Sequence, residues 1–320
     1  MFKLIFIVDL WYCGIVMVTR FHGVITPFIT PFKEDLSIDI DAIQWLVNYQ
    51  IEGGVHGVFP NSTTGEFVHL SKEESILIVK TVLDEVNDRI WVIPGISANS
   101  TLHCIELGRI FMDMGVNGII VTPPFFFKPS YDNLKMHFSM IAEKIDLPII
   151  IYNIPSTTGV NIPVKMYMEL SLEHDNIVGA KVTYDSFTYL RNLILDVKSL
   201  RSDFSVLTGL DDMFLPTLMM GGDGGIMALA NATPKLHRAI YDYWINGDIK
   251  SAYNYWMILL KLVKIYDYAS SFPTAVKTLL KIMNKPVKTF VRPPLTPEKN
   301  EVENKIKSIL NELKSYQFLL

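Results

Sequence analysis

Several apolar runs in this 320-residue sequence end in polar side chains that can do chemistry, and one of these is a lysine. Lys181 directly follows the apolar run 177–180. Burial removes the hydration of an ammonium group, so the pKa of a buried lysine falls and its neutral amine can attack a carbonyl carbon. The structural alternative is a lysine whose ammonium group extends from a strand end into solvent. Lys181 is therefore a candidate nucleophile for Schiff-base chemistry.

A tyrosine lies near the end of the preceding apolar run. Tyr152 lies in the run 148–153. If the two runs form neighbouring strands, its phenol reaches the same pocket as Lys181 and can relay protons while a carbinolamine forms and breaks down. A tyrosine at this position can also be a packed aromatic residue whose hydroxyl is satisfied locally. The pairing with Lys181 favours the catalytic interpretation.

Hydroxyl and carboxyl groups follow two other apolar runs. Thr63 and Thr64 precede Gly65 at a predicted strand-to-helix turn. Hydroxyls and backbone N–H groups at a helix start can bind a carboxylate, although Thr-Thr-Gly alone is a common loop sequence. Asp211 and Asp212 open another predicted helix, where capping is an alternative to catalysis.

Metal chemistry and disulfide bonds have little support in the sequence. Cys13 and Cys104 lie far apart and in no metal-ligand spacing, which predicts a reduced chain without a structural zinc. The histidines and carboxylates form no metal-like cluster. Four histidines lie in or beside predicted helices, where structural roles are expected: His69, His103, His137 and His237.

The elements that position these residues alternate regularly along the chain. Eight apolar runs are continuous rather than alternating, as in parallel strands covered on both faces. They are residues 23–28, 55–60, 90–95, 118–122, 148–153, 177–181, 204–209 and 224–228. Amphipathic segments between them begin after Asp39, Ser71 and Ser130, and Ser71 with Glu74 forms a capping-box pattern. The sequence therefore predicts an α/β fold, a (β/α)8 TIM barrel. An open doubly wound sheet is the alternative, but no Gly-x-Gly-x-x-Gly follows the first run.

Three parts of the chain are distinguished by composition. Residues 21–247 hold the βα alternation and form the predicted catalytic barrel, and residues 248–320 form a helical extension with a structural role, packed on the barrel. Residues 1–20 are apolar, but Asp9 interrupts them and no cleavage pattern follows, so neither a signal peptide nor a membrane span is favoured. We interpret this segment as an N-terminal extension that need not be native, with Met17 near the natural start.

The overall composition restricts the classes of partner. The net charge of −4 gives no basic face for a phosphate backbone, which argues against nucleic-acid binding. Apolar residues make up 49% and charged residues 19%, which indicates a globular protein with a sizeable core. We therefore expect a cytoplasmic protein that does not bind membranes and acts on a small molecule.

Five motifs occur in order and together resemble a known family. They are Ser62-Thr63-Thr64-Gly65-Glu66, the segment 121–130 containing Thr-Pro-Pro-Phe-Phe-Phe-Lys-Pro-Ser, Tyr152-Asn153-Ile154-Pro155, Gly179-Ala180-Lys181, and Gly209-Leu210-Asp211-Asp212 followed by the glycine-rich segment 221–225. From about Gly23 to Pro297 the chain resembles the dihydrodipicolinate synthase and N-acetylneuraminate lyase superfamily, the DapA-like class I pyruvate-dependent aldolases.

The resemblance implies roles for the candidate residues. It implies that Lys181 forms the Schiff base with pyruvate or another 2-oxo acid and that Tyr152 donates and accepts protons. Thr63 and Thr64 would hold the carboxylate, and the main chain at Ile226 would line the pocket. No metal or organic cofactor would be needed. A homotetramer built as a dimer of dimers is also implied.

Several residues differ from the family pattern, and these differences indicate which family members the chain resembles most in its substrate. Thr157 occupies the position where dihydrodipicolinate synthases carry an arginine for the aldehyde's carboxylate, and Phe126 corresponds to their relay tyrosine from a neighbouring subunit. Thr183 resembles the lysine-x-threonine of sugar-acid aldolases, and neutral hydroxyls suit a polyhydroxylated substrate. Ala228 replaces the family serine that would favour sialic acid. The substrate-binding set expected from these comparisons is Thr64, Thr157, Thr183, Gly209, Asp211 and Ile226.

These features predict an aldolase nearest in motif to 2-keto-3-deoxygluconate aldolases. It would cleave or form a 2-keto-3-deoxy sugar acid, with pyruvate as the nucleophilic partner and an aldehyde as the other. One alternative is synthase-like condensation of pyruvate with aspartate semialdehyde, and another is a non-catalytic 2-oxo-acid binding protein. A dehydratase outcome also stays open, because the same iminium supports elimination.

Overall fold

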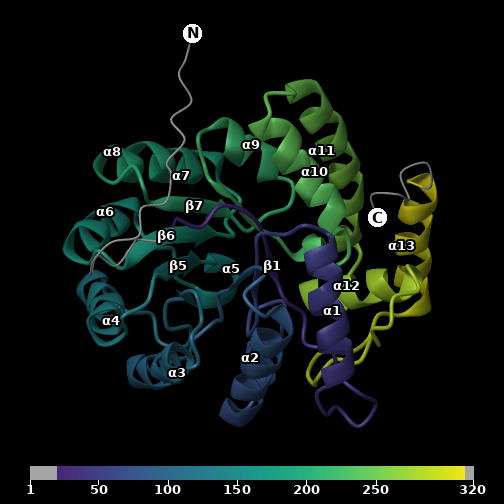
Figure 1. Ribbon diagram of the computed structural model, residues 1–320, viewed down its shortest axis with the longest axis horizontal. Coiled ribbons are helices and arrows are strands. Elements are labelled where there is room, and N and C mark those ends of the chain that lie inside the picture. The colour runs from purple at the N-terminus through teal and green to yellow at the C-terminus, as the bar shows by residue number, and fades with distance from the viewer. Residues whose placement is uncertain (1–19, 314–320) are drawn as a thin grey trace.

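Eight parallel strands form the centre of the computed structural model, which describes residues 20–313 (Figure 1). Their bounds are β1 Gly23–Pro27, β2 Gly57–Phe59, β3 Trp91–Val92, β4 Ile119–Val121, β5 Ile149–Asn153, β6 Ile177–Val182, β7 Ser205–Thr208 and β8 Gly224–Ile226. The strand order is β3-β2-β1-β8-β7-β6-β5-β4. The two ends of this order, β3 and β4, are joined by a parallel bridge between Gly95, which lies just beyond β3, and Ile120 in β4. The predicted TIM barrel is confirmed.

Helices surround the strands on the outside of the barrel (Figure 1). The helices of this region are α1 Ile40–Glu52, α2 Lys72–Val86, α3 Thr101–Asp113, α4 Tyr131–Lys144, α5 Pro155–Thr158, α6 Val164–Glu173, α7 Phe187–Asn192, α8 Lys198–Leu200, α9 Phe214–Met219 and α10 Pro234–Ile245. The short α5 lies near the centre of the view in Figure 1 rather than in the outer ring. Short turns of other helix types are η1 Phe67–His69, η2 Leu193–Val197, η3 Ala228–Asn231 and η4 Lys264–Asp267.

The helix starts predicted from sequence are confirmed by their capping hydrogen bonds. The side chains of Asp39 and Ser130 accept hydrogen bonds from backbone N–H groups in the first turns of α1 and α4. Ser71 and Glu74 form a reciprocal capping box at the start of α2. Each cap satisfies backbone donors that a helix start otherwise leaves unpaired.

Two layers of apolar packing hold the barrel together. Inside it, Ile25, Ile150 and Leu207 from different strands belong to one buried cluster that also contains Tyr152 and Ile226. Outside it, larger clusters lie between the strands and the helices. Both faces of the strands are therefore covered, which explains why the runs read as continuously apolar.

The C-terminal region consists of helices, as the sequence predicts. They are α11 Ile249–Val263, α12 Phe272–Ile282 and α13 Asn300–Glu312. The division of the chain at residues 20 and 247 stays a prediction, and the interpretation of Asp9, Cys13 and Met17 concerns a segment outside the described residues. Among residues 20–313, no helix is both long enough and apolar enough to span a bilayer.

Candidate active site

Lys181 lies in β6 with its amine inside the barrel rather than in solvent. Only 3% of the residue is exposed, and Nζ lies 4.0 Å from the centre of the Tyr152 ring and 5.0 Å from that of Phe59. Burial lowers the pKa of Lys181 to about 7, while the charge of Asp211 acts in the opposite direction. A large fraction of this amine is therefore neutral near pH 7.

Tyr152 is placed beside the lysine by the register of two neighbouring strands. β5 and β6 pair in parallel with Tyr152 opposite Lys181. The Tyr152 hydroxyl accepts a hydrogen bond from Oγ1 of Thr183 at 3.2 Å. Burial raises the pKa of Tyr152 to about 12, against the opposing effect of hydrogen bonds with Thr183 and Thr63. The phenol therefore keeps its proton at neutral pH and can donate it.

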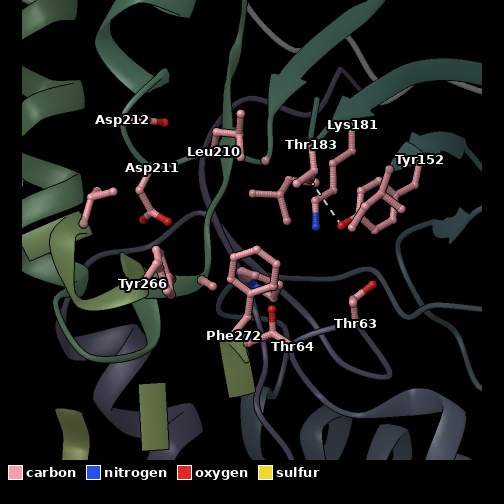
Figure 2. Close-up of a pocket in the computed structure, with 16 residues that line it drawn as sticks. Thr63, Thr64, Tyr152, Lys181, Thr183, Leu210, Asp211, Asp212, Tyr266 and Phe272 are labelled. Atoms are coloured by element: carbon pink, nitrogen blue, oxygen red, sulfur yellow. Dashed lines mark hydrogen bonds between the residues drawn. The ribbon is translucent and has the colours of Figure 1, made fainter. Parts of the chain in front are cut away.

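A cavity of about 210 Å³ opens onto this pair of side chains (Figure 2). Eight of the ten residues predicted from sequence line it: Thr63, Thr64, Tyr152, Lys181, Thr183, Gly209, Asp211 and Ile226. They come from the carboxyl ends of five strands, β2, β5, β6, β7 and β8, or from the turns that follow them. Their grouping at one end of the barrel is expected of a site built on this fold.

The other two predicted residues lie elsewhere. Thr157 is exposed in α5, where its hydroxyl donates a hydrogen bond to the carbonyl oxygen of Ile154 at 3.3 Å. It lines two adjoining cavities that share Thr63 with the main cavity, but not the main cavity itself. Phe126 is 79% exposed beside Phe127 and also lies outside the cavity lining. Direct contact of either side chain with a ligand on Lys181 is therefore not supported within one chain.

The turn that carries Thr63 and Thr64 is fixed by buried hydrogen bonds. The Ser62 hydroxyl donates to the carbonyl of Phe28 at 3.0 Å and accepts from the N–H of Gly65 at 3.0 Å. The carbonyl of Gly65 accepts from the hydroxyl of Thr30 at 2.7 Å. A Cβ at Gly65 would lie 2.6 Å from the Phe28 oxygen, so only glycine allows this close approach.

Asp211 does not cap the helix that follows it. The N-cap residue of α9 is Met213, and no side chain caps that helix. The Asp211 carboxylate instead contacts Nε2 of His237 at 2.8 Å, and both side chains are buried. The capping alternative is therefore wrong for Asp211, which lines the cavity and is held by a buried contact with His237.

The C-terminal extension reaches the site, which corrects the purely structural role expected for it. The cavity is lined by Val263 of α11, and also by Tyr266 of η4 and Phe272 of α12 (Figure 2). Asp212 also lines it, and burial followed by the charge of Asp211 raises the pKa of Asp212. Val263, Tyr266 and Phe272 lie outside every motif in the sequence, because tertiary packing alone brings them to the barrel mouth.

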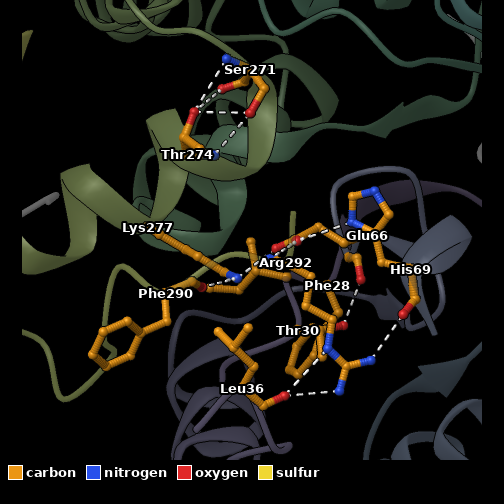
Figure 3. Close-up of polar contacts among 12 residues, drawn as sticks. Phe28, Thr30, Leu36, Glu66, His69, Ser271, Thr274, Lys277, Phe290 and Arg292 are labelled. Carbon is orange, nitrogen blue, oxygen red and sulfur yellow. Dashed lines mark hydrogen bonds and ion pairs between the residues drawn. The ribbon is translucent and has the colours of Figure 1, made fainter. Parts of the chain in front are cut away.

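A buried ionic network connects the same extension to the turn that carries Thr63 (Figure 3). Nζ of Lys277, in α12, lies 2.6 Å from Oε1 of Glu66, and both side chains are fully buried. The backbone N–H of Arg292 donates to Oε2 of Glu66 at 3.0 Å, and the Arg292 guanidinium binds Glu74 at 2.7 Å. Glu66 has a left-handed backbone, with φ of 59°, and lies two residues after Thr64.

Within residues 20–313, no group of three or more histidine, cysteine, aspartate or glutamate side chains is arranged to hold a metal ion. Cys104 is a buried free thiol, and burial raises its pKa to about 12. This thiol is consequently a poor nucleophile. The chemistry available to the cavity is that of an amine, a phenol, hydroxyls and carboxylates.

Comparisons with known proteins show which proteins the whole chain is similar to. The sequence model of the dihydrodipicolinate synthetase family matches residues 20–313. A protein of Thermofilum pendens described as an uncharacterized DapA-like lyase is 63% identical over 297 residues, covering 93% of this chain and 99% of that protein.

Two Escherichia coli proteins are also similar. YjhH, provisionally named a 2-dehydro-3-deoxy-D-pentonate aldolase, is 33% identical, covering 91% of this chain and 97% of its own. YagE, provisionally named a 2-dehydro-3-deoxy-D-gluconate aldolase, is 33% identical, covering 92% of this chain and 97% of its own. The crystal structure of YagE in complex with pyruvate has a TM-score of 0.90 and 32% identity, covering 92% of this chain and 99% of that one.

Gly209 directly follows β7, and Gly209→Ala should disrupt the packing around Thr183 and Lys181. An added Cβ would overlap the Thr183 hydroxyl and lie 3.1 Å from Cε of Lys181. Overpacking of this kind costs about 1–3 kcal/mol, which urea unfolding would measure. In a Thr183→Ala background the hydroxyl is absent, so the same substitution should cost clearly less. Equal costs in both backgrounds would contradict the placement of Thr183.

Removing one partner of the buried ionic network should destabilise the protein strongly. Lys277→Met leaves the Glu66 carboxylate without its ammonium partner and should cost about 3–5 kcal/mol of unfolding free energy, whereas Glu66→Gln with Lys277→Met should recover much of it. Lys281→Met is the control, because it removes a partly exposed pair with Glu303 from the same helix and should cost less than about 1 kcal/mol. Similar losses for the two lysines would contradict a special role for Lys277.

Proposed function

The chain belongs to the dihydrodipicolinate synthetase family, and we propose that it is an aldolase that cleaves or forms a 2-keto-3-deoxy sugar acid through a pyruvate imine on Lys181. The superfamily resemblance read from the motifs is confirmed by the family match, and members of this family are lyases. The sugar-acid substrate and the residue roles are our proposal. They follow from the contents of the cavity.

The observation that carries the proposal is the buried amine of Lys181 beside the phenol of Tyr152. Nζ lies 4.0 Å from the Tyr152 ring, and burial brings the lysine pKa to about 7. A neutral amine adds to C2 of pyruvate and gives a carbinolamine. Proton transfer through the Tyr152 hydroxyl then allows the oxygen to leave as water, and a protonated imine remains.

The imine would supply the electron sink for the bond-changing step. With C2 of pyruvate as an iminium carbon, C3 loses a proton and becomes the nucleophilic carbon of an enamine. That carbon attacks the aldehyde carbonyl, whose oxygen takes up a proton as the new C–C bond forms. The reverse sequence cleaves the sugar acid, and hydrolysis of the imine releases pyruvate and regenerates the amine.

The carboxylate of the 2-oxo acid would bind at the turn after β2. Thr63 and Thr64 line the cavity there, and their turn is fixed through Ser62 and Gly65. Hydroxyl donors in a buried site bind a carboxylate without adding a titratable charge. Because Thr63 also hydrogen-bonds with Tyr152, the carboxylate site and the proton relay share one residue.

The lining of the cavity supports a polyhydroxylated aldehyde without an anionic group. Among residues 20–313, Lys181 is the only lysine or arginine that lines this cavity, and Asp211 and Asp212 line it as well. A second anionic group would have no other lysine or arginine of the described lining to pair with, whereas carboxyl groups form hydrogen bonds with hydroxyls. YagE and YjhH, whose provisional names specify 2-dehydro-3-deoxy sugar acids, support the same substrate class.

We also propose that copies of this chain assemble through the loop between β4 and α4, within a homotetramer. Phe126 and Phe127 are 79% and 80% exposed, and their ring centres lie 5.1 Å apart. This exposed aromatic pair supports the proposal, because contiguous exposed apolar surface is typical of interaction sites.

Trapping with borohydride tests the mechanism directly. Reduction in the presence of pyruvate should add a pyruvate-derived mass to the peptide that contains Lys181, and Lys181→Met should abolish both the adduct and pyruvate release from keto-deoxy sugar acids. Lys285→Met is the matched control, because Lys285 is half-buried and lies outside the cavity lining. This control should retain both signals.

Each competing function gives a different result in that trapping experiment or in activity assays with the competing substrates. An unmodified Lys181 peptide would refute the imine mechanism. Condensation of pyruvate with aspartate semialdehyde, without cleavage of sugar acids, would replace our substrate with that of a synthase. Adduct formation without turnover of any aldehyde would indicate a 2-oxo-acid binding protein.

The rate of imine formation should depend on pH with a midpoint near 7. The neutral amine is the reactive form, so the rate should rise as the pH passes through the lowered pKa of Lys181 and then level off. Quenched-flow trapping with pyruvate between pH 5 and 10 would measure the midpoint. A rate that still climbs at pH 10 would indicate an ordinary, hydrated lysine.

A further inference from the structure

A fully buried histidine lies behind the active site and contacts oxygen acceptors through both ring nitrogens. Nδ1 of His237, in α10, lies 2.8 Å from the carbonyl oxygen of Thr233, and Nε2 lies 2.8 Å from Oδ1 of Asp211. The side chains of His237 and Asp211 are 0% and 3% exposed. Asp211 lines the cavity that contains Lys181.

The hydrogen-bond partners determine how many protons this pair carries. A carbonyl oxygen only accepts, so Nδ1 must carry a hydrogen. The Thr233 hydroxyl donates to the carbonyl of Leu229 at 3.1 Å, so it does not supply a proton to Nδ1. The contact between Nε2 and Asp211 then requires a second proton, on either the imidazole or the carboxyl group. In both arrangements the pair has no net charge.

We propose that His237 neutralises Asp211 and thereby keeps the amine of Lys181 uncharged and ready to attack a carbonyl group. His237 does not line the cavity, so it acts through Asp211 as a positioning residue that sets the local charge. Its consequence for catalysis rests on the proposed function. The protonation of the pair follows from geometry alone.

His237 can balance the negative charge of Asp211, whereas the neighbouring carboxyl and phenol groups cannot. The charge of Asp211 favours the ammonium form of Lys181, in opposition to burial. Asp212 adds a second carboxyl group nearby, and it cannot offset that charge. Tyr266 faces Asp211 from η4 (Figure 2), and burial, followed by the charge of Asp211, raises the pKa of Tyr266 well above the ordinary value. This phenol is therefore neutral and cannot balance Asp211 either.

The start of α10 contributes a further local charge beside this pair. His237 lies in the first turns of that helix, whose N-terminus carries partial positive charge. That partial charge disfavours a positive charge on the imidazole itself, and the Asp211 carboxyl group, 2.8 Å from Nε2, is the group that offsets it. Phe214 packs against the His237 ring at a centroid distance of 6.2 Å. The proton is thus held between buried groups.

The test measures the titration of Lys181 without a substrate. Reductive methylation by formaldehyde, followed by mass spectrometry of the Lys181 peptide, reports the fraction of neutral amine at each pH. His237→Gln keeps a neutral hydrogen-bond donor but removes the positive charge. Its midpoint should rise by about one pH unit relative to the parent protein, because Asp211 is no longer balanced.

A second variant distinguishes the effect of charge on the Lys181 midpoint from the effect of altered packing. Asp211→Asn with His237→Gln has no charge at either position, so the midpoint should return to within a few tenths of a pH unit of the parent value. Asp211→Asn alone should behave in the same way, since a neutral histidine then faces a neutral amide. His137→Gln is the control, because it makes the same substitution at a buried histidine that lies outside the cavity lining. It should leave the midpoint unchanged.

Specific outcomes would overturn the inference. A midpoint in His237→Gln equal to that of the parent would mean that His237 has only a packing role, and so would a raised midpoint that the double variant does not restore. Failure of the parent protein to form a pyruvate adduct would refute the proposed function instead. The methylation midpoints would still decide the charge of the pair.

Discussion

The loss of water around one amine is the physical constraint on which this site depends. Lys181 lies on a strand whose every residue is buried, and its amine faces aromatic rings rather than solvent. That environment favours the uncharged amine, which is the form that condenses with a ketone. The barrel supplies the burial, because strands covered on both faces deliver their last side chains into a closed interior. Asp211 opposes the effect, and the acidic lining therefore needs a compensating proton nearby.

The geometry around the amine comes from elements distant in sequence. The parallel register of β5 and β6 sets Tyr152 opposite Lys181, and the turn after β2 brings Thr63 to the same phenol. The helical extension then fixes that turn, since Lys277 forms a buried ion pair with Glu66. α12 therefore contributes twice, with Phe272 in the cavity wall and Lys277 beneath the turn. The C-terminal helical extension, for which the sequence predicts only a structural role, thus completes the mouth of the barrel.

The sequence predicts those parts of the site that depend on local pattern. Lys181 and Tyr152 end consecutive apolar runs, and parallel pairing of such runs places their ends together, so both could be located before the fold was known. The place of Thr157 could not be predicted in this way, because the short helix α5 directs the Thr157 hydroxyl to the carbonyl oxygen of Ile154. Tyr266 and Phe272 follow no strand, so nothing in their local sequence marks them as cavity residues. The contact of His237 with Asp211 spans 26 positions and depends on how α10 packs, which periodicity does not encode.

A crystal structure of the protein soaked with pyruvate at neutral pH would test the central claim most directly. The account predicts continuous electron density from Nζ of Lys181 to C2 of the ligand, with the ligand carboxylate at Thr63 and Thr64 and the Tyr152 hydroxyl beside the new bond. Pyruvate bound without a covalent link, or bound away from Lys181, would contradict it.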